Sequence, residues 1–95
     1  MDIREWQDLF VVAMNKRFPT EWTPEQRLLA IQRQLADVSQ TIQFGELGGI
    51  SLHQRIAAIL PDLFMLCEQH SVNLNEELPK VLAWFNGNAS KTSRG

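Results

Sequence analysis

Two aspartates are the residues of this chain that are best placed to do chemistry. Asp37 lies beside Val38 and Asp62 lies beside Leu63, so each carboxylate borders an apolar stripe. Carboxylates are rarely buried in small proteins, and carboxylate oxygens on facing helices are the ligands that Mg²⁺ prefers. The sequence therefore predicts a candidate metal site at Asp37 and Asp62. The alternative is that each aspartate is simply paired with a base, and Arg33 lies four residues before Asp37, at the spacing for such a pair.

The other reactive residue types favour structural roles, and no catalytic residue is assigned among them. Cys67 lies in an apolar stretch, where loss of solvent would raise the pKa of its thiol. His53 and His70 are expected on one helix, about 25 Å apart, so they cannot share a metal ion. Three tryptophans could stack on a nucleobase, although packing is the interpretation that we favour for each: Trp6, Trp22 and Trp84.

The composition is typical of one small globular domain. The 95 residues are 44% apolar and carry a net charge of −2, which argues against a nucleic-acid-binding domain. The single cysteine excludes a disulfide scaffold. No apolar run reaches the roughly 18 residues of a membrane span, and the N-terminus lacks the apolar stretch of a signal peptide, which predicts a cytoplasmic protein. A chain of this length hides only about 60–65% of its surface on folding, which favours association of chains.

Apolar residues recur at steps of three and four, which predicts an all-α fold of four helices. The first helix is expected over residues 2–17. The second, over residues 24–43, begins at a capping box formed by Thr23 and Gln26. Its apolar residues lie on one face: Leu28, Ile31, Leu35, Val38 and Ile42. The third is expected over residues 51–70, with a kink near its middle.

Pro61 is the residue expected to cause that kink, and Ser51 and Gln54 form a second capping box. The second and third helices are the longest, and we expect them to be antiparallel because a short glycine-rich loop joins them. The shorter last helix is expected to begin with Asn75 as its N-cap and to end at Gly87. Its expected buried residues are Leu78, Val81, Leu82 and Phe85. The predicted domain is residues 1–87, followed by a disordered polar tail at residues 88–95.

Three sequence stretches follow one another in an informative order. The first is Arg-Gln-Leu-Ala-Asp-Val at residues 33–38, and the second is Ile-Leu-Pro-Asp-Leu-Phe-Met-Leu at residues 59–66. The third, at residues 69–78, contains Ser-Val-Asn-Leu-Asn-Glu-Glu. This order resembles the MazG-like branch of the all-α NTP pyrophosphohydrolase superfamily. That family carries E-E-x-x-E on one helix, E-x-x-D on the next, and a segment like G-I-D-L-E-E-A before the last helix.

The resemblance covers about residues 3–86 and implies a bundle completed by oligomerisation. It also implies Mg²⁺-dependent hydrolysis between the α and β phosphates of a nucleotide. The matched motif, however, has lost three of its five acids, since these positions hold Arg33, Gln34 and Ile59, while Asp37 and Asp62 remain. A guanidinium at Arg33 could neutralise Asp37, and Asp62 as well, in place of the metal ion. Mg²⁺ is therefore implied only if the protein is active.

Three functions remain open from the sequence. The first is a degenerate MazG-like homo-oligomer, a dimer or tetramer, with weak or absent pyrophosphohydrolase activity and with binding of a nucleotide or protein partner left open. The second is an active Mg²⁺-dependent (d)NTP pyrophosphohydrolase for nucleotide-pool housecleaning, with an altered site that includes Asp37 and Asp62. The third is a helical adaptor that binds another protein through its apolar surface. None of these predicts a membrane or nucleic-acid partner.

Overall fold

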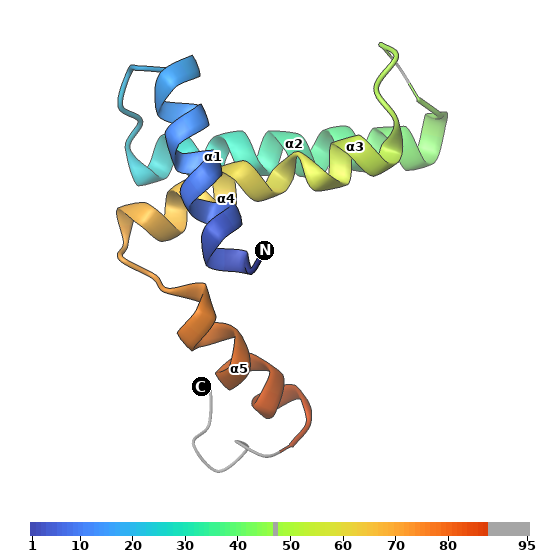
Figure 1. Ribbon diagram of the computed structural model, residues 1–95. Helices are drawn as coiled ribbons and strands as arrows, with labels where there is room; N and C mark the ends of the chain where they lie inside the picture. Colours follow the sequence, from blue (N-terminus) through green and yellow to red (C-terminus); the bar gives the residue numbers. More distant parts are fainter. Residues whose placement is uncertain (47, 88–95) are drawn as a thin grey trace.

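The computed structural model describes residues 1–46 and 48–87, and its regular structure in those ranges is entirely helical (Figure 1). This confirms the predicted all-α class. The predicted tail at residues 88–95 lies outside the described residues. The helices are α1 (Ile3–Arg17), α2 (Pro24–Phe44), α3 (Leu52–Ala57), α4 (Ile59–Gln69) and α5 (Leu74–Phe85).

The first two helices begin where side chains satisfy backbone amides that have no partner within the helix. At the start of α1, the Asp2 carboxylate accepts a hydrogen bond of 2.9 Å from the amide of Glu5. At the start of α2, the Thr23 hydroxyl accepts from the amide of Gln26 at 3.2 Å, and the Gln26 side chain accepts from the amide of Thr23 at 2.9 Å. The predicted capping box of the second helix is therefore confirmed, whereas the sequence reading did not identify the cap at Asp2.

The predicted third helix is present as two successive helices, α3 and α4, which continue in nearly the same direction in Figure 1. Ser51 caps α3 as predicted and accepts from the amide of Gln54 at 3.1 Å. Pro61 has no amide hydrogen, so the carbonyl of Ala57 loses the donor that a continuous helix would provide. The kink expected at Pro61 thus takes the form of a break at Ala58.

Helix α4 lies at the centre of the fold and packs against α1 on one side and α2 on another. The rings of Phe10 on α1 and Phe64 on α4 stack with their centroids 5.9 Å apart. Ile31 on α2 and Met65 on α4 are also buried. This apolar core is small, because few of the chain's large side chains take part in it.

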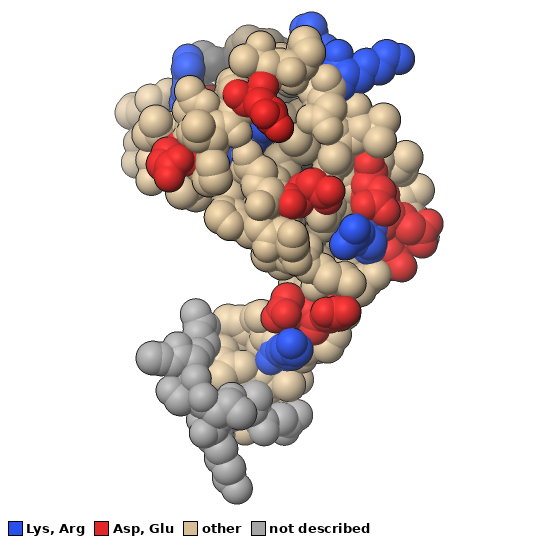
Figure 2. Space-filling model, turned by 90° about the vertical axis from the view of Figure 1, so that its left-hand side faces the viewer, with Lys and Arg blue, Asp and Glu red and all other residues tan. Residues whose placement is uncertain are grey.

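Helix α5 stands apart from the other helices and packs chiefly against α1 (Figure 1). In Figure 2 it forms a lobe joined to the body by a narrow waist. Its N-cap is Asn73, whose side chain accepts from the amide of Asn75 at 3.0 Å. The predicted N-cap at Asn75 is therefore wrong, because the preceding asparagine already satisfies that amide and the helix begins at Leu74.

Many apolar side chains remain uncovered in the single chain. Only part of the predicted apolar face of α2 is covered. Ile31 is buried and Val38 is half-buried. The other three residues of this face are exposed: Leu28, Leu35 and Ile42. The prediction that α5 buries its apolar face is wrong for the single chain, because α5 has little besides α1 to pack against. Its four exposed residues are Leu78, Val81, Leu82 and Phe85.

The overall dimensions agree with this exposure. The accessible surface is 7292 Å², whereas a compact chain of this size exposes about 5,600 Å². The radius of gyration is 15.6 Å, against about 12 Å for a compact domain of this length. Within the described residues, no helix combines the length and the hydropathy needed to cross a membrane.

Candidate functional site

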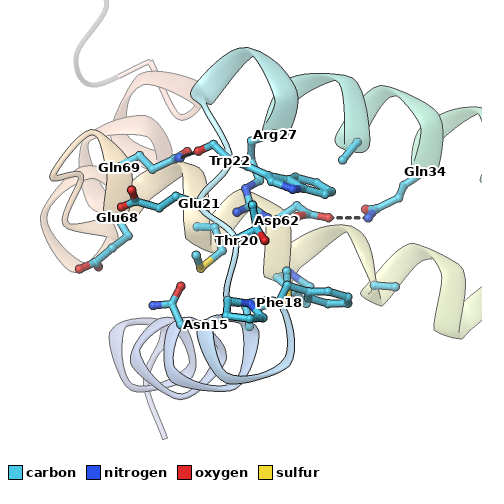
Figure 3. Close-up of a pocket in the computed structure, with 16 residues that line it drawn as sticks. Asn15, Phe18, Thr20, Glu21, Trp22, Arg27, Gln34, Asp62, Glu68 and Gln69 are labelled. Atoms are coloured by element: carbon cyan, nitrogen blue, oxygen red, sulfur yellow. Dashed lines mark hydrogen bonds and ion pairs between the residues drawn. The ribbon is translucent and has the colours of Figure 1, made fainter.

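Three polar side chains meet between α2 and α4 and form what we call the Arg27–Asp62–Gln34 cluster (Figure 3). Nη1 of Arg27 donates to Oδ1 of Asp62 at 2.7 Å. Nε2 of Gln34 donates a short hydrogen bond to Oδ2 of the same carboxylate. The side chains of Arg27 and Asp62 are 8% and 7% exposed, so this is a buried ion pair. Both carboxylate oxygens of Asp62 are therefore engaged.

The spacing of residues along α2 explains how this cluster is assembled. Arg27, Ile31, Gln34, Val38 and Thr41 follow one another at steps of four and three, which places them in one stripe along the helix. All five are buried or half-buried, and α2 packs on both α3 and α4. The inward face of α2 therefore begins with a cation and includes an amide, and both reach the carboxylate in the first turn of α4.

The base that neutralises Asp62 is Arg27 and not Arg33, which corrects the expectation from the sequence. Arg33 is exposed, and within residues 1–46 and 48–87 it forms an ion pair with neither Asp37 nor Asp62. Arg33 lies six positions after Arg27, so it points about 120° away from Arg27 around the helix. The half-buried Asp37 borders a shallow hollow together with Arg33 and Gln34 and takes no part in the cluster.

The tryptophans have aromatic or cationic neighbours. The guanidinium carbon of Arg27 lies 4.9 Å from the centroid of the Trp22 ring, which is the distance of a cation–π contact. Trp6 stacks on Phe10 with centroids 6.0 Å apart. Trp84 on α5 lies edge-on to its neighbouring phenylalanine at 4.8 Å. Trp22 thus covers the cluster from the side of the connection between α1 and α2 (Figure 3).

A cavity of about 550 Å³ lies beside the cluster, between the end of α1, the connection at residues 18–23, α2 and α4. This volume falls within the usual range of small-molecule sites, roughly 300–1,000 Å³. Arg27, Gln34 and Asp62 line it, and the carboxylates of Glu21 and Glu68 line it as well. Its apolar wall includes Met14, Phe18, Trp22 and Met65. The sequence reading did not identify this cavity, because its walls come from four separate segments.

Two other acids that could approach the site have partners of their own. Asp8 is paired with Arg4 of the same helix at 3.1 Å. Glu68 accepts a hydrogen bond of 3.4 Å from Nε2 of Gln7, which is itself fully buried between α1 and α4. In the part of the chain that the structure describes, no three His, Cys, Asp or Glu side chains come together as they would around a metal ion.

Cys67, His53 and His70 take no part in the hydrogen bonds of the Arg27–Asp62–Gln34 cluster. Cys67 is half-buried, and burial raises the pKa of its thiol, with a backbone hydrogen bond acting less strongly in the opposite direction. A raised pKa reduces the fraction of thiolate, the reactive form, at neutral pH. His53 is exposed on α3, and His70 is exposed at the end of α4.

No protein-family model, curated protein or solved structure matches the chain.

Proposed function

We propose that the chain is a MazG-like helical homo-oligomer whose nucleotide pyrophosphohydrolase activity is weak or absent. The observation that carries this proposal is the hydrogen bonding of Asp62, a residue that the resemblance matches to a metal ligand. Its two oxygens accept hydrogen bonds from Arg27 and Gln34, and Gln34 itself occupies a matched acid position. A guanidinium and an amide thus stand where the family would have a metal ion and a carboxylate.

A Mg²⁺ ion does not fit the residues present. Mg²⁺ requires oxygen ligands in near-octahedral geometry, and both oxygens of Asp62 are already engaged by donors. The Arg27 guanidinium, 2.7 Å from Oδ1, would also repel a divalent cation. The other two altered positions, Arg33 and Ile59, supply no side-chain oxygen. For these reasons we expect little or no metal-dependent hydrolysis.

Exposed apolar side chains support the oligomer. Leu28, Leu35 and Ile42 are seven residues apart and form an exposed stripe on α2, which we call the α2 stripe. A second exposed set lies on α3 and α4: Ile56, Leu60 and Leu63. A dimer or tetramer in which copies cover these stripes would bury this apolar surface.

The proposal predicts that a panel of (d)NTPs with Mg²⁺ or Mn²⁺ yields no pyrophosphate above the rate without protein. The physical reason is that the cluster provides no metal to neutralise the phosphate charge. Released pyrophosphate can be measured by a coupled colorimetric assay at micromolar protein concentration. Asp62→Asn and Asp37→Asn serve as matched variants. An active enzyme with an altered site would need both carboxylates, and Asp37 can be changed without disturbing the buried cluster.

Metal-dependent release of pyrophosphate that both variants abolish would establish the active enzyme instead. Isothermal titration with Mg²⁺ provides an independent measurement, since a degenerate site predicts little or no heat. A monomeric wild-type protein at micromolar concentration, measured by light scattering, would contradict the homo-oligomer.

A helical adaptor is a second candidate, and one observation favours it. Helix α5 exposes Leu78, Val81, Leu82 and Phe85, and among the described helices it packs chiefly on α1. An amphipathic helix with an open apolar face is a common mode of protein recognition. Co-purification of one distinct protein at fixed stoichiometry would favour the adaptor, whereas self-association that covers α5 would favour the homo-oligomer.

A further inference from the structure

The cavity beside the Arg27–Asp62–Gln34 cluster carries an excess of negative charge. Its charged lining residues are three carboxylates, Glu21, Asp62 and Glu68, and one guanidinium, Arg27. Since Arg27 is paired with Asp62, the carboxylates of Glu21 and Glu68 remain as the net charge of the lining. Within the part of the chain that the structure describes, neither is paired with a lysine or arginine.

The two uncompensated carboxylates lie at the same side of the cavity. In Figure 3, Glu21 and Glu68 lie at one side, next to Gln69, and Gln34 lies at the other. Gln69 is held in place because its Nε2 donates to the carbonyl of Trp22 at 2.7 Å. The guanidinium carbon of Arg17 lies 5.3 Å from the centroid of the Phe18 ring. Arg17 itself does not line the cavity. The cavity thus has a negatively charged side formed by groups from two separate segments.

The wall of the cavity is largely apolar and aromatic. Phe18 and Trp22 contribute aromatic rings, and Met14 and Met65 contribute thioethers. Aromatic rings offer a large apolar surface on which a ligand can pack, and flexible methionines adapt to an apolar body of irregular shape. An aromatic wall next to carboxylates is the combination that recognises an organic cation, since the apolar part packs on the wall and the charge is stabilised at the acidic side.

We infer that this cavity binds a small organic cation with an apolar or aromatic body, such as an arylalkylamine, and disfavours anions that include nucleoside triphosphates. This inference rests on the proposed function in one respect, which is that no Mg²⁺ ion occupies the cluster and reverses the local charge. It does not depend on the resemblance to any family.

The test uses three probes with the same aromatic body and different charge: phenethylamine, phenethyl alcohol and phenylacetate. Each is titrated into the full-length protein with a chelator present and no nucleotide. The indole N–H resonance of Trp22 is followed by NMR, and that of Trp84 on α5 is an internal reference away from the cavity. The expected affinity of phenethylamine is about tenfold higher than that of the alcohol, because two carboxylates act on the cation. Phenylacetate is expected to produce no shift of Trp22.

The variant Glu21→Gln/Glu68→Gln removes the negative side while it keeps hydrogen-bonding side chains of the same shape. It is expected to reduce the tenfold preference for the amine to about twofold or less. Glu25→Gln is the matched control, because this exposed residue of α2 does not line the cavity. Circular dichroism establishes that each variant keeps its helices.

Equal affinity for the amine and the alcohol, a preference that survives the double variant, or the lack of any shift at Trp22 would each overturn the inference. All these titrations are carried out without nucleotide and without metal. A negative outcome here therefore leaves the pyrophosphate assay unaffected, and a positive pyrophosphate assay leaves the charge preference to be judged by its own titration.

Discussion

Asp62→Ala is expected to lower the free energy of unfolding by about 3–5 kcal/mol, because it leaves a buried guanidinium without its partner. Arg27 and Asp62 are each less than a tenth exposed, so the guanidinium left without its partner would be poorly solvated. Gln34 loses its hydrogen-bond acceptor at the same time. The measurement is urea unfolding followed by circular dichroism at a fixed protein concentration, because the proposed association of chains would also contribute to stability.

Two control variants separate this effect from the loss of any carboxylate. Asp8→Ala removes one side of the exposed pair with Arg4, and we expect a change below about 1 kcal/mol. Arg27→Met/Asp62→Leu replaces both charges by apolar groups and should recover most of the stability lost in Asp62→Ala, because no uncompensated charge remains. A loss in Asp62→Ala no larger than that in Asp8→Ala would show that the ion pair is not buried in solution.

Leu35→Glu is expected to convert the proposed oligomer into a monomer at micromolar concentration. Leu35 is the central residue of the α2 stripe and is 52% exposed in the single chain. A glutamate in the middle of an apolar interface would have to be desolvated without a partner, and we expect the association constant to fall at least about a hundredfold. Light scattering coupled to size-exclusion chromatography measures the mass directly.

The matched control is Gln40→Glu, which introduces the same carboxylate on α2. Gln40 is exposed and lies about 140° around the helix from Leu35, so this variant should keep the mass of the wild type. A wild-type protein that is already monomeric would contradict the proposed oligomer. An oligomer that survives Leu35→Glu would show that the copies associate through another surface, such as α3 and α4 or α5.

The helices could be predicted from the sequence because their signals are local. The capping boxes at Thr23 and Ser51 involve residues three positions apart. Pro61 affects only the turn of helix that precedes it. The N-cap of α5 was misplaced because two asparagines, Asn73 and Asn75, compete for the same role within three residues. Local rules alone do not decide between them.

The candidate site was predicted less well, because its contacts join residues that are far apart in the sequence. Asp62 was identified as an unusual carboxylate beside an apolar stripe, but its partner Arg27 lies 35 residues earlier. Spacing along the chain favours Arg33, which lies four residues before Asp37 but points away from the cluster. One signal was available: Arg27, Gln34 and Thr41 are seven residues apart, so a polar stripe accompanied the apolar one along the same helix.

Burial was predicted least well, since hydropathy does not tell which apolar face a single chain can cover. The stripe at Leu28, Leu35 and Ile42 has the same periodicity as a buried face, yet α2 turns a different stripe toward α4. A sequence pattern predicts that a face will be covered and leaves open whether the covering surface belongs to the same molecule. In this chain, the sequence pattern predicts more buried apolar residues than the single molecule buries.

The isolation of α5 connects the shape of the molecule with its local stability. This helix has 12 residues, about the length below which a helix is marginal in water without tertiary contacts. Pro79 within it removes a further backbone hydrogen bond. Its amides should therefore exchange with solvent sooner than those of α4, and dilution should accelerate that exchange if a second chain covers the helix. The helical content of residues 74–85 would then depend on protein concentration, and α5 would become fully ordered only when another molecule covers it.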